Sequence, residues 1–203
     1  MSAPDRPQWV VREDASVQVL IALYVRQLLG IRSPDELPVL RGAPTPEVVR
    51  DELEQATLER QWRAFWAMTV EPQAHPSDVP LDLVDGFDTF IAIPTQGYDE
   101  LRTALLPLGD QALAFAREAN AAYSAVATSG AGASYRAYAS AIAQHERQIG
   151  RRAHSFELNV QILPLTQRGV WWIGSLTIAV TDGLRGDVAA FDAAVGPIIA
   201  DIA

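Results

Sequence analysis

The most regular pattern of apolar and polar positions lies in the last third of the chain. Every second residue from Phe156 to Ile162 is apolar and the residues between them are polar, a period of two that is typical of a half-buried β-strand. Pro164 and Gly169 bound a predicted turn, and residues 170–181 then predict a returning strand. We therefore expect a C-terminal β-hairpin.

Apolar residues at helical spacing predict a series of helices. In the first, apolar side chains cover nearly the whole circumference, which predicts a buried helix that Gly30 ends. The second begins at Thr45, where an N-cap hydroxyl, a proline and an acid follow one another. The predicted helices are residues 14–29 (starting at 14 or 16), 45–68, 98–128 with an interruption or bend near Pro107 and Gly109, 135–152 and 187–202.

The remaining segments complete a fold prediction. Residues 1–12 contain two prolines and predict an extended arm, whereas residues 87–93 alternate and predict a further strand. An isolated two-stranded hairpin is marginal in water, so either this strand or a second copy of the chain must extend the sheet. The prediction is a single α+β domain over residues 1–203, with four to five helices packed on a small antiparallel sheet built around the C-terminal β-hairpin.

Composition and charge narrow the classes of function. The 203 residues are 49% hydrophobic and 20% charged, which suits one globular domain. There is no cysteine, so thiol catalysis, disulfides and iron–sulfur clusters are excluded. The net charge of −9, concentrated in residues 1–110, disfavours general binding to nucleic acid or to an anionic membrane. No signal peptide or long apolar run is recognisable, which predicts a cytoplasmic protein.

Few residues have the spacing that catalysis or metal binding requires. His145 lies in a predicted helix, but the position four residues later is Ile149, so the second ligand of a zinc-binding helix is missing. Asp82, Asp85 and Asp88 form an acidic loop without the alternating oxygen ligands of a calcium site. We therefore predict no metal and no cofactor, and the sequence identifies no catalytic residue.

Two other features offer candidate sites. Arg147, Arg151 and Arg152 form a basic cluster that either binds an anion or complements the dipole at a helix end. The glycine-rich residues 129–134 precede a helix, but no strand and no lysine accompany them, so they do not form a phosphate-binding loop. We interpret them as a connector between helices.

The aromatic residues carry the main functional hypothesis. Trp171 and Ile173 fall on the polar face of the predicted returning strand, and together with Leu163 and Leu165 they form an apolar cluster at the hairpin tip. Either the helix with Trp62 and Trp66 covers this tip, or the two groups form a surface for a partner or ligand.

Two classes of function follow. The first is a non-enzymatic interaction or small-ligand-binding protein, a homodimer that uses Leu163, Leu165, Trp171, Ile173, Trp62 and Trp66, with Arg147, Arg151 and Arg152 as an anion site. The alternative is an enzyme whose site, drawn from Asp82, Asp85, His145 and the arginines, assembles only on folding.

Overall fold

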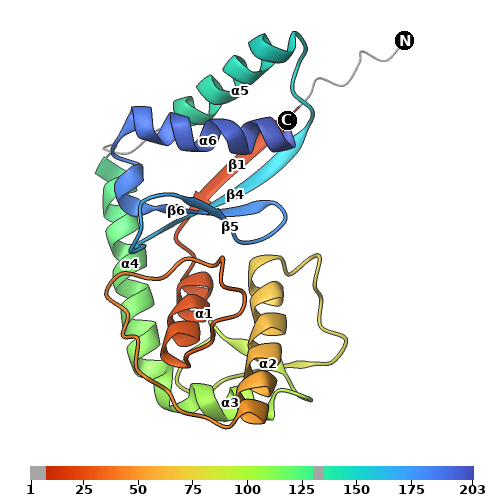
Figure 1. The fold of residues 1–203 in the computed structure, drawn as a ribbon, viewed down its shortest axis with the longest axis vertical. Helices are drawn as coiled ribbons and strands as arrows, with labels where there is room; N and C mark the ends of the chain where they lie inside the picture. Colours follow the sequence, from red (N-terminus) through yellow and green to blue (C-terminus); the bar gives the residue numbers. More distant parts are fainter. Residues whose placement is uncertain (1–7, 130–134) are drawn as a thin grey trace.

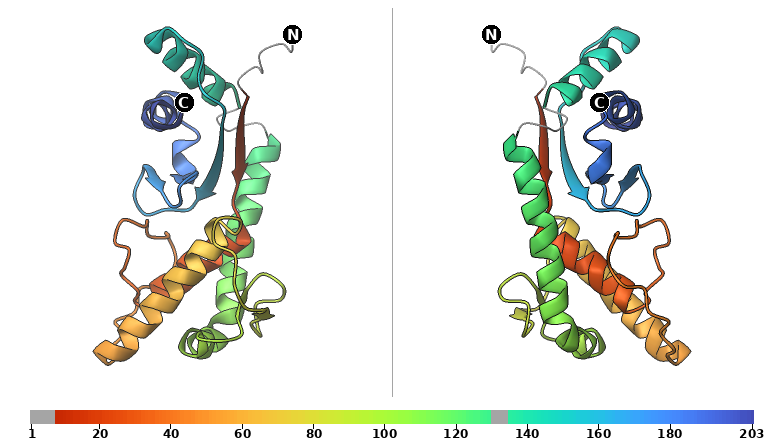
Figure 2. Two further views of the ribbon diagram at one scale, coloured as in Figure 1. Left: turned by 90° about the vertical axis from the view of Figure 1, so that its right-hand side faces the viewer. Right: turned by 90° about the vertical axis from the view of Figure 1, so that its left-hand side faces the viewer.

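The computed structural model describes residues 8–129 and 135–203, which form two halves (Figure 1). The lower, helical half contains α1, α2 and α3, and the upper, sheet half contains a four-stranded sheet with α5 and α6. The long helix α4 runs beside both halves, as the side views show (Figure 2). The helices are α1 (Val17–Leu28), α2 (Glu52–Val70), α3 (Asp99–Leu105), α4 (Gly109–Ser129), α5 (Tyr135–Ile149) and α6 (Val188–Ile202).

The main sheet has the strand order β1-β4-β6-β5. Its strands are β1 (Trp9–Asp14), β4 (Phe156–Leu163), β5 (Val170–Trp172) and β6 (Thr177–Thr181). β4 is parallel to both β1 and β6, and only β5 is antiparallel to its neighbour β6. The α+β class is confirmed, but the sheet is mixed, so the prediction of an antiparallel sheet built on one long hairpin is wrong.

The predicted strand over residues 170–181 is two strands separated by a tight turn. The backbone N–H groups of Ile173 and Gly174 both donate to the carbonyl of Thr177, which closes a short hairpin between β5 and β6. After this turn β6 lies between β4 and β5 and runs parallel to β4. The apolar residues Ile173 and Leu176 lie on either side of the turn, so the sequence pattern resembles one continuous strand and does not reveal the turn.

The predicted extended arm is also corrected in part. Residues 1–7 lie outside the described residues, but the following segment is strand β1, paired along its whole length with β4. The alternation of half-buried and exposed side chains from Trp9 to Asp14 is that of a strand with one covered face. This strand extends the sheet, in place of residues 87–93.

The helices of the lower half follow the predictions with shifted ends. α1 is capped by Ser16, whose hydroxyl accepts from the backbone of Val19, and it ends before Gly30, which has a positive φ of 63°. α2 begins later than predicted, with Asp51 as its N-cap. The hydroxyl of Thr45 instead accepts a hydrogen bond of 3.1 Å from the side chain of Gln27.

Residues 87–93 do not form the predicted strand. The short strands β2 (Leu81–Leu83) and β3 (Ala92–Pro94) make a separate antiparallel pair, and a turn with Asp88 at a φ of 51° lies between them. Phe87 and Ile91 are buried in the helical half. The apolar residues of this segment therefore alternate because the loop is buried against the helices, and not because it is a strand of the main sheet.

Two buried clusters correspond to the two halves. One joins α1, α2 and α3 with the lower end of the sheet, and the other lies between the sheet and helices α5 and α6. Tyr123 of α4 packs against both clusters. In residues 8–129 and 135–203, no helix has the length and apolar character needed to cross a membrane.

Glu71, at the end of α2, connects the helical half to the β5–β6 turn through hydrogen bonds. Its Oε1 accepts from the backbone N–H of Ser175 at 2.7 Å, the Ser175 hydroxyl at 2.5 Å and the backbone N–H of Leu176 at 3.2 Å. Burial alone would raise the pKa of Glu71, but these hydrogen bonds outweigh it and hold the pKa below its ordinary value. A Cβ at Gly174 would lie 2.8 Å from Val70, so glycine permits the close approach.

We expect Glu71→Gln to lower the free energy of unfolding by about 1.5–3 kcal/mol at pH 7, because three donors then face a neutral oxygen. A carboxylate whose folded pKa is depressed stabilises the protein above its unfolded pKa, and this contribution is lost as pH falls through the folded value. The difference from wild type should therefore vanish at acidic pH in urea denaturation. Glu118→Gln, on the exposed face of α4, is the control; a deficit that is unchanged at low pH would contradict the account.

Candidate ligand-binding site

The carboxyl ends of three parallel strands meet at the edge of the sheet that faces the helical half. These ends are Asp14 of β1, Leu163 of β4 and Thr181 of β6. In sheets with parallel strands, ligands bind beyond this edge, where the chain leaves the strands and side chains converge. The short helix η2 (Asp182–Leu184) and then Arg185 follow β6 at this place.

A largely buried ion pair lies at this edge. Glu13 has the same parity on β1 as Trp9 and Val11, so its side chain points to the face covered by α5 and α6. Its Oε2 lies 2.8 Å from Nη2 of Arg185, and the two side chains are only 16% and 11% exposed. A charge in this position needs a partner, and each residue supplies one for the other.

Two tyrosines complete the cluster. The hydroxyl of Tyr138, on α5, donates to Oε1 of Glu13 at 2.6 Å, and burial together with Glu13 raises its pKa so far that it stays protonated. The ring of Tyr123, on α4, lies 5.4 Å from the Arg185 guanidinium carbon and makes a cation–π contact. Burial raises the pKa of Tyr123 as well, and Glu13 raises it further while Arg185 opposes the change. Both phenols are therefore hydrogen-bond donors at neutral pH.

Arg185 is incompletely satisfied by these contacts. A guanidinium has five N–H groups, and in the part of the chain that the structure describes the buried Nε and Nη1 atoms have no hydrogen-bond partner. Buried donors without an acceptor are costly and uncommon in folded proteins. Arg185 therefore has capacity for an acceptor that the chain itself does not supply.

A cavity of about 120 Å³ adjoins this arginine. One wall is a single face of α4, where the short side chains of Ala119 and Ala122 leave space beside the sheet. The other residues that line it are Tyr123, Val126, Ile162, Pro164, Asp182 and Arg185. Ala122 and Val126 are exposed, so the cavity opens to solvent along α4. The Oδ2 atom of Asp182 is paired with Arg41 at 2.5 Å, which leaves Arg185 as the charged donor of the cavity.

The chemistry of the cavity follows from these lining residues. No family model, curated protein or solved structure matches the chain. A guanidinium, a phenol and hydrocarbon walls suit a small apolar molecule that carries one anionic acceptor.

The residues predicted to form a partner surface are buried or half-buried within the protein. Leu163, Leu165, Ile173, Trp62 and Trp66 all belong to the buried cluster of the helical half, and the half-buried Trp171 packs against it. Residues 39–41 pair with residues 164–166, and Glu71 after α2 contacts the β5–β6 turn, so other parts of the same chain cover the tip. These six side chains form no exposed surface for a partner.

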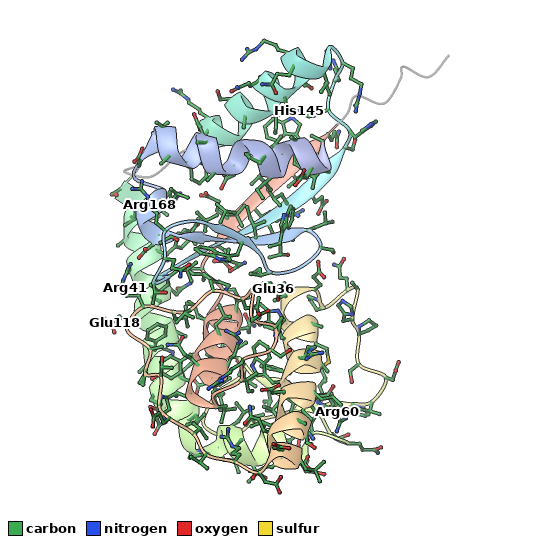
Figure 3. All side chains as sticks on the ribbon, viewed as in Figure 1. Glu36, Arg41, Arg60, Glu118, His145 and Arg168 are labelled. Carbon is green, nitrogen blue, oxygen red and sulfur yellow. The ribbon has the colours of Figure 1, made fainter. Side chains whose placement is uncertain are left out.

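The other predicted site residues lie far apart. His145 is on α5 at the upper end of the molecule (Figure 3), whereas Asp82 and Asp88 pair with Arg102 and Arg117 in the helical half. Asp85 is exposed in the same loop as Asp82 and Asp88. In residues 8–129 and 135–203, no group of three or more histidine and acidic side chains is placed to hold a metal ion. The carboxylates and His145 of the enzyme hypothesis are not brought together.

The three arginines of the anion hypothesis are exposed at the end of α5. Arg147 lies in the last turn of α5, which ends at Ile149 and not at the predicted residue 152, because Gly150 takes a φ of 67°. Nη1 of Arg151 donates to the backbone carbonyl of Arg152 at 3.1 Å. Their use as an anion site stays a prediction. Residues 130–134 of the glycine-rich connector lie outside the described residues.

Glu13, Tyr123, Tyr138 and Arg185 were not predicted as site residues. The sequence did contain one indication: Glu13 alternates in step with the apolar residues Trp9 and Val11, and an acid on the covered face of a strand requires a partner. It could be used only if residues 9–14 were assigned as a strand. The partner Arg185 is 172 residues away along the chain and nothing in the sequence marks it.

Proposed function

We propose that the chain is a non-enzymatic protein that binds a small, largely apolar carboxylate in the cavity beside Arg185. The observation that carries the proposal is a guanidinium at the wall of an apolar cavity whose buried Nε and Nη1 atoms, with three N–H groups between them, have no hydrogen-bond partner. Guanidinium and carboxylate form strong charge-assisted hydrogen bonds, and an apolar environment strengthens them.

The volume of the cavity restricts the size of the ligand. An apolar cavity of about 150 Å³ holds one benzene molecule. At about 120 Å³ with an open side, the present cavity suits a single ring or a short branched chain, with the carboxylate toward Arg185. Benzoate is therefore a suitable probe.

Binding requires a small change of side-chain conformation. Nε and Nη1 of Arg185 are shielded from solvent in the free protein. The ring of Tyr123 lies over the guanidinium and also lines the cavity, so its rotation would expose these donors to the ligand.

Calorimetric titration with benzoate tests the proposal. We expect saturable binding with a Kd of about 1 mM or tighter, corresponding to ~4 kcal/mol. Benzyl alcohol, which has a similar ring without the charge, should bind about tenfold more weakly because it cannot form the charge-assisted pair. Equal affinity for the two compounds, or no saturable binding of benzoate, would overturn the proposal.

Two variants on neighbouring positions of α4 locate the site. Ala122→Leu places a larger side chain at the mouth of the cavity and should weaken benzoate binding at least about tenfold through steric exclusion. Ala121→Leu makes the same change at an exposed position that does not line the cavity, and it should bind like wild type. If the two variants bind benzoate equally, the ligand lies elsewhere.

The predictions of cytoplasmic location and of a homodimer are separate from the ligand proposal. Cytoplasmic location remains a prediction from the sequence. The homodimer also remains a prediction. The apolar tip no longer supports it, because those side chains are covered by the same chain. The remaining reason for association is that β1 and β5 are edge strands of the main sheet. Oligomeric state is independent of the ligand proposal, because the cavity is lined by one chain.

A further inference from the structure

A second surface lies in the helical half, between the start of α2 and α3. It is a groove of about 580 Å³ whose floor includes the apolar side chains of Leu28, Leu58, Ala104 and Leu108. We call it the α2–α3 groove. It shares no lining residue with the cavity beside Arg185.

Large apolar side chains are exposed beside this groove. Val49 is 96% exposed, Leu53 is 76% exposed and Leu106 is 50% exposed. Each directly precedes a groove-lining residue along the chain. Contiguous apolar surface with a polar rim is characteristic of sites where proteins interact. Large apolar side chains are therefore exposed in the segments of chain that border the groove.

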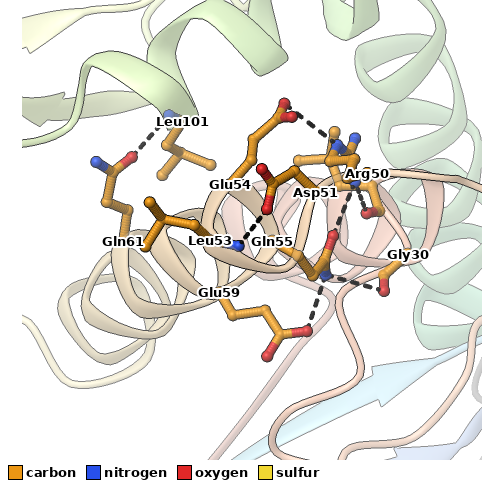
Figure 4. A network of polar contacts seen from close by, with 10 residues as sticks. Gly30, Arg50, Asp51, Leu53, Glu54, Gln55, Glu59, Gln61 and Leu101 are labelled. Atoms are coloured by element: carbon orange, nitrogen blue, oxygen red, sulfur yellow. Dashed lines mark hydrogen bonds and ion pairs between the residues drawn. The ribbon is translucent and has the colours of Figure 1, made fainter.

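The rim of the groove is acidic. Glu54, Asp99 and Glu100 line it, and Arg50 is its basic residue. The guanidinium of Arg50 is directed inward, where it donates to the carbonyl of Leu29 and to Gln55 (Figure 4). Arg50 is only 15% exposed, whereas Glu54, 3.9 Å from it, is 60% exposed. The charge that an approaching molecule meets is therefore mainly negative.

We propose that the α2–α3 groove binds a basic amphipathic α-helix of another protein. The apolar face of such a helix would cover Leu53, Val49 and the groove floor, and its lysines or arginines would lie against the acidic rim. This is the usual mode in which a helix lies in a groove, with apolar anchors and flanking charges. The net charge of −9, which resides in the half of the sequence that builds this groove, favours the encounter.

A second copy of the chain does not meet these requirements. The basic end of α5 is the cationic helix terminus of this chain, but the apolar face of α5 is already buried through Ala137, Tyr138 and Ile142. A contact from α5 of one copy to the groove of the next would also be head-to-tail and would build a ring or an open chain, not a two-fold dimer. The partner is therefore a different protein.

Fluorescence polarisation with two labelled synthetic helices tests the proposal. The first is an amphipathic peptide of leucine and lysine, and the second has glutamate in place of every lysine. We expect saturable binding of the lysine peptide, at least about tenfold tighter than binding of the glutamate peptide, and weaker at high salt. Equal binding of both peptides, or no binding of the lysine peptide, would overturn the proposal.

Matched variants distinguish the groove from a general acidic surface. Val49→Ala/Leu53→Ala removes exposed apolar area and should weaken binding of the lysine peptide at least about fivefold, whereas Val188→Ala, exposed on α6, should not. Glu54→Lys should weaken it, whereas Glu118→Lys, labelled on α4 in Figure 3, should not. Equal losses in the two lysine variants would overturn the groove assignment. Self-association that Val49→Ala/Leu53→Ala abolishes would assign the groove to a second copy instead.

Discussion

Arg185→Met should lower the free energy of unfolding by about 3 kcal/mol, because it leaves the Glu13 carboxylate buried without its cation. Each side chain keeps a small exposed fraction, so we expect the lower end of the range for a broken buried pair. Tyr138 still donates to Glu13, but one neutral hydrogen bond does not replace a guanidinium. Urea denaturation followed by circular dichroism measures the change.

Removing both charges should restore most of this stability. In Glu13→Gln/Arg185→Met the amide oxygen still accepts from Tyr138, and no charge remains buried. We expect the double variant to lie within about 1 kcal/mol of wild type. Because it folds, it also serves in the ligand titration, where its preference for benzoate over benzyl alcohol should disappear. A double variant as unstable as Arg185→Met would contradict the described pairing.

Trp62→Ala should cost about 3–5 kcal/mol, the largest effect of any single substitution that we predict. The indole is fully buried, stacks on Trp66 with ring centroids 5.5 Å apart, and donates from Nε1 to the carbonyl of Ala22 at 3.1 Å. Its loss opens a cavity where α1 meets α2. Chemical denaturation gives the free energy of unfolding.

The same substitution distinguishes the two interpretations of the aromatic residues. If Trp62 formed a surface for a partner, the isolated chain would lose little stability on its removal. Leu53→Ala, on the same helix at an exposed position, should change the free energy of unfolding by less than about 0.5 kcal/mol and is the matched control. A loss of similar size in both variants would contradict the packing described for α2.

The sequence predicts elements well where a local pattern is continuous. The alternation from Phe156 to Ile162 corresponds to β4, and the apolar segment before Gly30 corresponds to α1. Both were predictable because the spacing of apolar residues shows whether one face or every face of the element is buried. Strand order is not predictable in this way. Gly174 and Ser175 lie in the turn that separates β5 from β6, and this turn is bound by Glu71, about a hundred residues earlier in the chain, which no local pattern reveals.

The candidate sites depend on contacts between distant segments. Glu13 and Arg185 come from opposite ends of the chain, and the cavity beside them exists because alanines of α4 face the ends of two strands. No motif joins these residues along the sequence. Trp62 and Trp66 stand out in the sequence because they are large and rare, but both are buried in the core of the helical half.

The position of a heavy-atom ligand shows whether the cavity beside Arg185 binds a carboxylate. In crystals soaked with 4-bromobenzoate, the anomalous signal of bromine locates the ring without reference to any other density. We predict one bromine peak between α4 and the end of β4, lined by Ala122 and Ile162, with the carboxylate within hydrogen-bond distance of Arg185. An ordered bromine found only outside this cavity, or no ordered bromine at saturating ligand, would contradict the account.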